Sequence, residues 1–312
     1  MVVGRAGRYR HCCEAHNMKL LATADLHYNH PRSRSLAVEL IEQINREKFD
    51  VLLLAGDTAI SEGEDLEACL SMFTFSGPKL FICGNHELWT RTGDSHEIFQ
   101  HQLPRRVRAM GWHWLERDPL ILGDVGFVGS IGWYDYSLAP DHLQIPRRFY
   151  EMKISPGAAD RIWEYRSLVR NNGELLPDVN ERHLNIVARW NDGRYVKLHR
   201  PDGDFLRECI DGLRESLEKT RGAKRVIAAV HHLPFAQLLP PRHTDTWDFV
   251  WAYLGSSQIG DLLLQCANVS HVLCGHTHLP LEAQVDHIKA INIGSGYRQK
   301  RIITLEFPES AA

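Results

Sequence analysis

The sequence has no apolar run long enough to cross a membrane, and it lacks the even, regularly spaced cysteines of a disulfide framework. Its seven cysteines are an odd number, and several fall within apolar periodic stretches, where cysteine packs as a small hydrophobe. None has the spacing of a cysteine-based zinc site. The first residues lack the apolar core of a signal peptide. We therefore expect a cytoplasmic protein that has no membrane partner.

The sequence also lacks a large excess of charge of one sign. Its 36 basic and 39 acidic side chains leave a formal net charge of −3 at pH 7. Proteins that bind nucleic acid stably usually carry a basic surface, so nucleic acid is not expected as a stable partner. Hydrophobic residues make up 44% of the chain and charged residues 24%, as in ordinary globular proteins. Composition does not determine an oligomeric state.

Five short polar motifs each follow an apolar run that has the length of a buried strand. These runs cover residues 19–24, 51–55, 80–83, 226–230 and 272–274. In order, the motifs are Asp25-Leu26-His27, Gly56-Asp57, Gly84-Asn85-His86-Glu87, His231-His232 and Gly275-His276-Thr277-His278. Motifs at the carboxyl ends of strands converge on one edge of a sheet in α/β folds. We therefore expect these side chains to form a single site.

The donors that these motifs offer suit divalent transition metals. Two Asp carboxylates, one Asn amide oxygen and four His imidazoles form a mixed oxygen and nitrogen set. Such a set favours Mn, Fe, Zn or Co, whereas a calcium site would be nearly all oxygen and a structural zinc site rich in thiolate. Seven donors are too many for one ion. Two ions that share one carboxylate would use all seven as four plus four.

The motifs resemble those of the calcineurin-like metallophosphoesterases, whose signature is D-x-H, G-D, G-N-H-[DE], H and G-H-x-H. All five elements occur here in that order between residues 25 and 278. The resemblance implies that Asp25, His27, Asp57 and His278 hold one metal, and that Asp57, Asn85, His231 and His276 hold the other, with Asp57 bridging. It implies a dinuclear phosphoric ester hydrolase. Manganese is the first expectation for the two divalent ions, with Fe, Zn, Co or Ni as alternatives.

Two positions depart from the family pattern. Many members extend G-D to G-D-x-x-D, but Ile60 stands where the second Asp would be. That carboxylate is not one of the seven family ligands, so its absence affects the surroundings of the metals rather than their number. At the fourth motif the family commonly has H-H-P or H-x-P, whereas this chain has His231-His232-Leu233-Pro234. We assign His231 because it directly ends the apolar run, and His232 is the alternative.

The resemblance also implies a mechanism in which a hydroxide that bridges the metals attacks phosphorus. The His of G-N-H-[DE] is not a ligand in the family and is the usual candidate for the general acid, which here is His86. An imidazole can titrate near the operating pH, as a general acid should. His86 and Asp57 are thus the expected catalytic residues. Glu87 is expected to orient a ligand imidazole by accepting its second N–H.

The fold class expected is α/β (α+β). Ala37, Leu40, Ile41 and Ile44 recur at helical spacing, and a long amphipathic helix is predicted over residues 206–217. Short strands are predicted at residues 281–285, 288–293 and 301–307. With the resemblance, this order implies a metallo-dependent phosphatase-like sandwich of two mixed β-sheets flanked by helices, over residues 18–312. Residues 1–17 have no apolar period and are expected to form a flexible extension.

Residues from about 133 to 222 carry no donor motif and are too many for a simple connection. We expect a helical or loop insertion that caps the metals, since loops on a rigid scaffold usually set specificity. The alternative is a peripheral excursion that only packs on the core. Candidate residues of a substrate pocket are Trp89, Arg91, Tyr134, His232 and Tyr297. An aromatic side chain could stack on a base or aryl group, and an arginine could bind a phosphate.

These observations predict a phosphoesterase that acts on a small phosphorylated substrate, either a phosphomonoester or a phosphodiester, nucleotides included. One alternative is a nuclease of the same fold, although those enzymes usually carry a separate DNA-binding cap and a dimer surface. A protein phosphatase is another. A non-catalytic scaffold of the same fold is a third, and the complete set of seven donors argues against it.

Overall fold

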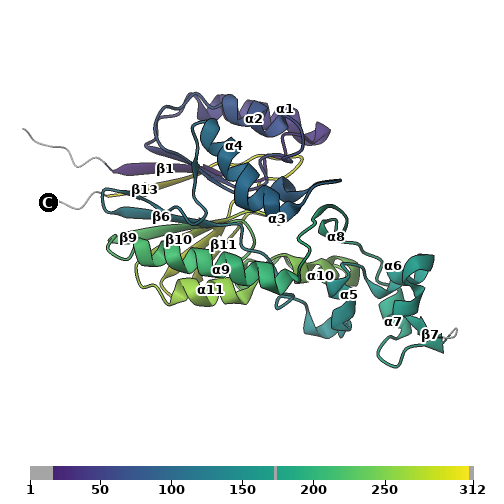
Figure 1. Ribbon diagram of the computed structural model, residues 1–312. Helices are drawn as coiled ribbons and strands as arrows, with labels where there is room; N and C mark the ends of the chain where they lie inside the picture. Colours follow the sequence, from purple (N-terminus) through teal and green to yellow (C-terminus); the bar gives the residue numbers. More distant parts are fainter. Residues whose placement is uncertain (1–16, 172–173, 309–312) are drawn as a thin grey trace, which may run out of the picture.

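The computed structural model describes residues 17–171 and 174–308. Two β-sheets lie face to face, and helices cover the outer face of each (Figure 1). The predicted fold, a sandwich of two mixed sheets flanked by helices, is confirmed. The predicted flexible extension at residues 1–17 lies outside the described residues, except for Asn17.

Both sheets mix parallel and antiparallel strands. The first has the order β13-β1-β2-β3-β4, with β1 to β4 parallel and β13 antiparallel to β1. Its strands are β1 (Met18–Thr23), β2 (Val51–Ala55), β3 (Lys79–Ile82), β4 (His113–Trp114) and β13 (Ile303–Phe307). The second has the order β11-β12-β10-β9-β6-β5, in which the four central strands are parallel. Its strands are β5 (Leu120–Leu122), β6 (Val125–Ser130), β9 (Arg225–Val230), β10 (Val269–Cys274), β11 (Leu281–Val285) and β12 (Ile288–Asn292).

The strands β1, β2 and β3 in the middle of the first sheet are buried on both faces, and their successive side chains point to opposite sides of the sheet. In β2, Leu53 belongs to an apolar cluster that also contains Phe127 and Leu273 of the second sheet. Its neighbour Leu54 belongs to the cluster that contains the inward side chains of the helices. The strands therefore read as continuous apolar runs, and their directions and ends are fixed by packing on both sides.

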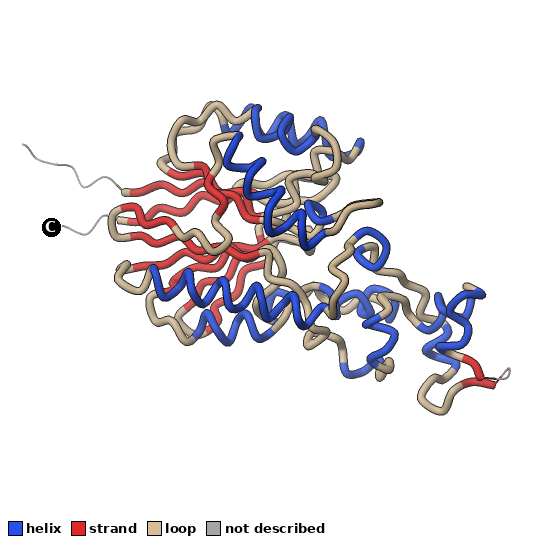
Figure 2. Tube along the Cα trace, viewed as in Figure 1, coloured by secondary structure: helices blue, strands red, loops and turns tan. Residues whose placement is uncertain are grey.

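The helices fall into two outer layers and a projecting segment (Figures 1 and 2). The first sheet is covered by α1 (Pro31–Ile44), α2 (Asp65–Ser71) and α4 (Leu103–Ala109), and the second by α9 (Asp202–Lys219) and α11 (Ser257–Leu264). The shorter helices are α3 (Ser95–Glu97), α5 (Arg147–Glu151), α6 (Pro156–Arg161), α7 (Glu181–Leu184), α8 (Asp192–Tyr195) and α10 (Asp245–Phe249). The short 3₁₀ segments are η1 (His86–Leu88), η3 (Asp141–Leu143), η4 (Trp163–Leu168), η5 (Ala236–Leu238) and η6 (Val250–Tyr253), and η2 (Ile98–Gln102) is a π segment.

The segment predicted as an insertion, residues 133–222, divides into a part that belongs to the sandwich and a part that projects from it. Its last helix, α9, packs against β6 and belongs to the sandwich. The part from α5 to α8 lies beyond the carboxyl ends of the strands, and α6, α7 and the small hairpin of β7 (Arg170–Asn171) and β8 (Glu174–Leu175) project furthest. The part that stands off from the sheets is thus shorter than residues 133–222.

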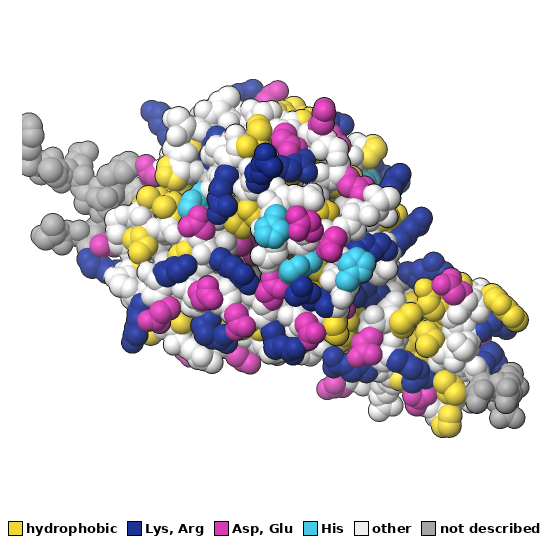
Figure 3. All heavy atoms as spheres, viewed as in Figure 1, with side chains coloured by type: hydrophobic (Ala, Val, Ile, Leu, Met, Phe, Trp, Pro, Cys, Tyr) yellow, Lys and Arg dark blue, Asp and Glu magenta, His cyan; other side chains and the backbone are white. Residues whose placement is uncertain are grey.

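The surface on the face shown in Figure 3 carries intermingled acidic and basic side chains over both sheet layers. Hydrophobic side chains gather on the projecting part that holds α6 and α7. Among the helices of the described residues, none is both long and apolar enough to span a membrane.

Candidate active site

The five polar motifs meet at the carboxyl ends of β1, β2, β3, β9 and β10. Ligand atoms of Asp25, His27, Asp57 and His278 all lie within 4.8 Å of one another. Ligand atoms of Asp57, His231 and His276 form a second group of the same kind, and Asn85 Oδ1 lies 3.3 Å from His231 Nε2. The structure thus brings together all seven donors predicted from the sequence.

Asp57 lies between the two groups. Its Oδ2 is 3.7 Å from His27 Nε2, while its Oδ1 is 3.4 Å from His231 Nε2. Within the first group, His27 Nε2 and His278 Nε2 are 3.0 Å apart. The two oxygens of one carboxylate therefore face different sets of nitrogen donors, an arrangement that allows one side chain to serve two neighbouring cations.

His231 and His232 point to different places. His231 Nδ1 lies 2.9 Å from the carbonyl oxygen of Ala55 and donates to it, which leaves Nε2 facing Asp57 and Asn85. His232 is also fully buried, but its Nδ1 donates to the carbonyl of Ile131, and no described residue bonds to its Nε2. The geometry favours His231 as the donor and makes His232 a neighbour of the site.

The backbone of the donor loops is bent into an unusual conformation. Five of the seven donors have positive φ angles, although none is glycine: Asp25 (51°), His27 (43°), Asp57 (54°), His276 (73°) and His278 (60°). This region of backbone space is sparsely populated by residues with a Cβ. Such strain tends to collect at functional sites, where packing holds side chains in positions that an unstrained loop would not give them.

Glycines make room for donors from neighbouring loops. A Cβ on Gly84 would lie 2.2 Å from Asp57 Oδ1. A Cβ on Gly56 would lie 2.4 Å from His231 Nδ1, and Gly56 also has a φ of +88°. The glycine of each of these motifs is therefore required for the approach of a donor that comes from another motif.

Glu87 binds backbone rather than the imidazole that we expected it to orient. Its carboxylate accepts hydrogen bonds from the N–H groups of Asp57, Thr58, Ala59 and Gly84 at 2.6–3.2 Å. It is fully buried. The expected role is therefore wrong: Glu87 joins the loop after β2 to the loop after β3, and so fixes Asp57 relative to Asn85.

Burial and the shared carboxylate set the protonation of the donors. Burial lowers the pKa of His27 and His276 well below the usual range, so both rings are neutral and keep a lone pair. Burial would also lower the pKa of His231, but the adjacent Asp57 carboxylate outweighs it and raises this pKa to about 10. Burial raises the pKa of Asp57, but His86 and His231 reverse the effect and hold it well below its usual range.

His86 lies beside the donors without belonging to either group. Its backbone N–H donates to Asp57 Oδ1 at 2.9 Å, and its Nε2 is 3.8 Å from Asp57 Oδ2. The ring stacks on Trp89, with ring centroids 3.7 Å apart. Burial lowers the pKa of His86, and the carboxylates of Asp57 and Asp192 oppose that shift. The ring is therefore held beside the Asp57 carboxylate that lies between the two groups of donors.

Asp192, on α8, is a buried residue of the site that sequence reasoning did not select. Its carboxylate accepts hydrogen bonds from Asn85 Nδ2 (2.9 Å), Trp89 Nε1 (2.7 Å), Trp190 Nε1 (2.7 Å) and Tyr134 Oη (3.2 Å). Holding the Asn85 amide by its nitrogen leaves Oδ1 facing His231. No local signal in the sequence distinguishes Asp192 from other aspartates.

An aromatic cavity of about 740 Å³ opens beside the donors. Asp57, Asn85, His86, His276 and His278 form its polar end. The remaining wall is mostly apolar and comes largely from segments far away in sequence: Trp89, Trp190, Asn191, Pro240, Pro241, Arg242, His243, Trp247, Val250, Trp251, Leu254, Thr277, Leu279 and Tyr297. Its volume is in the range of small-molecule sites.

Two of the five candidate pocket residues line this cavity, namely Trp89 and Tyr297. Tyr134 and His232 do not, because both are fully buried behind its wall. Arg91 is exposed, and it is its backbone N–H, not its guanidinium, that binds Glu62. The aromatic character of the pocket was thus expected, but most of the side chains that provide it were not.

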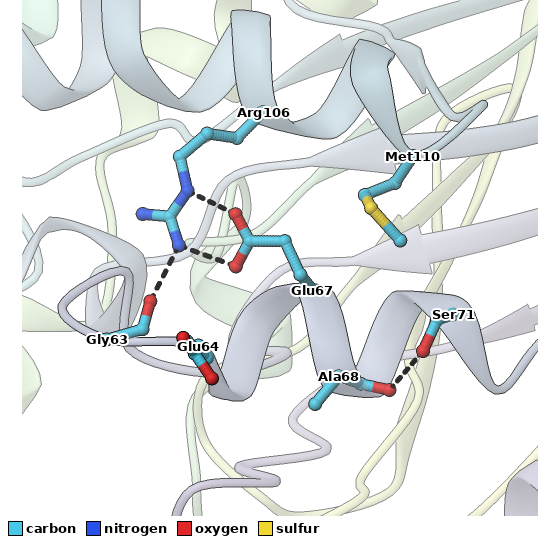
Figure 4. Close-up of a pocket in the computed structure, with 7 residues that line it drawn as sticks. All are labelled: Gly63, Glu64, Glu67, Ala68, Ser71, Arg106 and Met110. Carbon is cyan, nitrogen blue, oxygen red and sulfur yellow. Dashed lines mark hydrogen bonds and ion pairs between the residues drawn. The ribbon is translucent and has the colours of Figure 1, made fainter.

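Two other features lie apart from the donors. A hollow of about 770 Å³ between α2 and α4 contains none of the predicted residues, and Arg106 spans it to bind Glu67 and the carbonyl of Gly63 (Figure 4). His142, Asp245 and Asp248 also lie close enough together to hold a cation, but His142 pairs with Asp248 and Arg182 pairs with Asp245. Both features are explained by ion pairs within the fold.

Comparison with known proteins gave the following similarities. The chain is similar to phosphopantetheinyl hydrolase (PptH) from Mycobacterium tuberculosis, with a TM-score of 0.64 and 19% identity over 91% of each chain. It is also similar to a dimetal phosphatase from Danio rerio, with a TM-score of 0.48 and 15% identity over 94% of this chain and 99% of the other. No curated protein matches the sequence. The model of the calcineurin-like phosphoesterases matches residues 18–280. The chain therefore belongs to the calcineurin-like phosphoesterase family.

Proposed function

We propose that this chain is a dinuclear metal-dependent phosphoesterase that hydrolyses a small phosphorylated substrate. One cation would be held by Asp25, His27, Asp57 and His278, and the other by Asp57, Asn85, His231 and His276. The observation that carries the proposal is that the two oxygens of Asp57 face the two groups of donors. Members of the family are metal-dependent, and two cations sharing one carboxylate account for all seven donors.

The orientation of two imidazoles supports this assignment. His231 donates its Nδ1–H to the carbonyl of Ala55 at 2.9 Å, and His276 Nε2 lies 3.2 Å from the carbonyl of Tyr253. Each ring thus uses one nitrogen as a donor to the backbone, which leaves the other nitrogen for a metal. On His231, a bound cation would take the place of the proton that the Asp57 carboxylate favours. Metal-ligating histidines characteristically donate their second N–H in this way.

When bound, a pair of divalent cations supplies Lewis-acid chemistry, activating water as the nucleophile and neutralising charge on the phosphoryl oxygens. The protein then has to position the ester and to protonate the leaving oxygen. His86 lies at the polar end of the aromatic cavity, where a leaving group would reside. We assign it as the general acid, and Trp89 holds its ring by stacking.

Metal content tests the assignment of donors. After chelation, protein supplied with Mn²⁺ and then separated from free metal is expected to hold two ions per chain, measured by elemental analysis. Asp57→Asn should weaken the binding of both ions, because it alters the residue that both share. His142→Ala is the matched control, since His142 belongs to the separate group near α10 and should leave the metal content unchanged. One ion per chain in the unaltered protein would contradict the dinuclear proposal.

His86→Ala tests the general acid. Turnover should fall by about two to four orders of magnitude, the usual contribution of a positioned acid, while metal content is retained. The loss should be smaller for nitrophenyl esters than for alkyl esters, because nitrophenolate leaves without a proton. A suitable panel is nitrophenyl phosphate, bis-nitrophenyl phosphate, nucleotides and a phosphopantetheinyl ester. Loss of metal together with activity would identify His86 as a ligand and refute the assigned role.

A further inference from the structure

A second hollow adjoins the donors and shares part of its wall with the aromatic cavity. It has a volume of about 560 Å³ and is lined by His30, Arg32, Trp89, Asn191, His278, Gly294, Gly296, Tyr297, Arg298 and Gln299. Four of these residues, Trp89, Asn191, His278 and Tyr297, also line the aromatic cavity. The donor His278 is thus part of both walls, and a phosphate bound at the metal site would lie where the two hollows meet.

The two hollows differ in charge. No acidic side chain lines the second one, whereas two arginines do. Within the described residues, neither Arg32 nor Arg298 forms an ion pair, although nearby Arg34 on the same helix pairs with Asp65 at 2.7 Å. His30 and Arg32 also stand at the start of α1, where the helix dipole adds positive potential and the first turn has no acidic residue to offset it. We call this hollow the arginine groove.

The general acid faces only one of the hollows. His86 lines the aromatic cavity and not the arginine groove. A leaving group that receives its proton from His86 therefore belongs in the aromatic cavity, and the part of the substrate in the arginine groove stays attached to phosphorus. The two substituents of the phosphate are distinguished by their surroundings: one lies in a mostly aromatic wall that contains a single arginine, Arg242, and the other lies beside two arginines and no carboxylate.

We infer that the substrate is an unsymmetrical phosphodiester with a second phosphate on one arm, an inference that rests on the proposed function. The scissile phosphate lies at the metal donors, an apolar or aromatic arm lies among Trp190, Trp247 and Trp251, and the second phosphate binds Arg32 and Arg298. Water supplies the new P–O bond, and the P–O bond to the apolar arm breaks. His86 protonates the oxygen of that arm, so the products are an alcohol and a phosphomonoester that keeps the second phosphate.

Two chromogenic diesters that differ only in the second phosphate test the groove. One is thymidine 5′-(4-nitrophenyl) phosphate, and the other is the same ester with a 3′-phosphate. Both release nitrophenolate, so the ratio of their kcat/KM values reports recognition of the added phosphate. With Mn²⁺-loaded protein, we expect a ratio of about 10 to 100 in favour of the phosphorylated ester, the range for hydrogen bonds to a charged group.

Arg32→Ala and Arg298→Ala should each lower this ratio, and the double variant should bring it close to one. Arg32→Lys should keep part of it, since the charge remains but the paired N–H geometry is lost. Arg34→Ala, which removes the same charge from the same helix outside the groove, should keep the ratio of the unaltered protein. A ratio near one in the unaltered protein, or a ratio that survives in the double variant, would overturn the inference.

Binding measured without turnover separates this inference from the proposed activity. Calorimetric titration should show that thymidine 3′,5′-bisphosphate binds more tightly than thymidine 5′-monophosphate, with a difference that the double variant loses. If neither ester is hydrolysed but this preference holds, the proposed activity fails and the arginine groove stands as an anion site. Equal affinity for the two nucleotides would refute the groove whether or not the esters react.

Discussion

At the scale of single residues, the donors of this site are held in conformations that their backbone resists. Asp25, His27, Asp57, His276 and His278 all lie in the left-handed region. The cost is roughly 1–2 kcal/mol for each residue with a Cβ. The surrounding strands and the carboxylate of Glu87 over-determine the loops, so the strain is retained. The strained loops lower the free energy of unfolding, but they hold the donors in fixed positions.

His278 offers a direct measure of this strain, because its side chain is partly exposed and its φ is 60°. In metal-free protein, His278→Gly should be more stable than His278→Ala by roughly 1 kcal/mol, since glycine tolerates positive φ. Urea denaturation in the presence of a chelator gives the two free energies of unfolding.

The matched pair is Glu39→Gly and Glu39→Ala, at an exposed position within α1. There the order should reverse, because glycine in a helix is less stable than alanine by roughly 1 kcal/mol. If His278→Gly is no more stable than His278→Ala while the Glu39 pair behaves as expected, the donor loops are not strained in the way inferred.

At the scale of elements, a single-turn helix completes a site that is otherwise built by strand ends. The side chain of Asp192 on α8 binds Asn85, Trp89, Trp190 and Tyr134. It therefore couples a predicted metal donor to two walls of the aromatic cavity. A second buried aspartate, Asp202 at the start of α9, gathers Trp133, Tyr136 and Lys153 in a similar way but contacts no donor. Each helix is thus anchored by a buried aspartate that accepts hydrogen bonds, but only Asp192 also holds a predicted metal donor.

Asp192→Asn should lower metal affinity or turnover by about 10- to 100-fold, as is usual when a partner of a metal ligand is replaced. One acceptor oxygen would become an amide donor facing other donors, so Asn85 would lose its fixed orientation. Asp202→Asn is the control: it should lower the free energy of unfolding but leave metal affinity as it is. Calorimetric Mn²⁺ titration and urea denaturation of both variants measure these effects. Equal metal affinity in the two variants would show that Asp192 has only a structural role.

At the scale of the whole molecule, the two sheets are joined by a segment that buries a carboxyl group between them. Glu116 forms a bridge with Gly129 of β6 in the second sheet, and its Oε1 accepts from the N–H of Cys83 at the end of β3 in the first sheet. The side chain is only 6% exposed. Burial raises the pKa of Glu116 to about 8, above the usual value of 4.5.

Because the pKa of Glu116 is higher in the folded state than in the unfolded chain, the folded protein binds this proton more strongly. The associated stability is present below about pH 4.5 and is lost as pH rises towards 8. Between pH 5.5 and 8.5, the unaltered protein should therefore lose stability relative to Glu116→Gln, by on the order of 1–4 kcal/mol. Urea denaturation at the two pH values measures this difference.

Glu164→Gln, at an exposed position in η4, removes one carboxylate from the surface and should follow the pH dependence of the unaltered protein. Parallel curves for the unaltered protein and Glu116→Gln would mean that Glu116 is ionised in the fold at all the pH values tested.

The five motifs could be found from the sequence, and their resemblance to a known family implied the two-sheet fold and the seven donors that the structure brings together. The motifs depend on local patterns: a buried strand reads as a short apolar run, and the residues that follow it are placed by the strand's carboxyl end. His231 could be preferred over His232 for the same reason, since it directly ends β9. The glycines of the Gly56-Asp57 and Gly84-Asn85 motifs are also visible in the sequence, and they mark places where a donor from another motif approaches the backbone.

The surroundings of the donors depend on tertiary packing. Asp192, the tryptophans at 190, 247 and 251, and the arginines at 32 and 298 meet at the site from segments far apart in the chain. Tyr134 is aromatic like its neighbours, yet it is fully buried behind the wall, where its hydroxyl binds Asp192. Strand ends are placed by short-range periodicity, whereas cavity walls depend on how loops without periodicity pack against one another. That packing leaves no local pattern in the sequence.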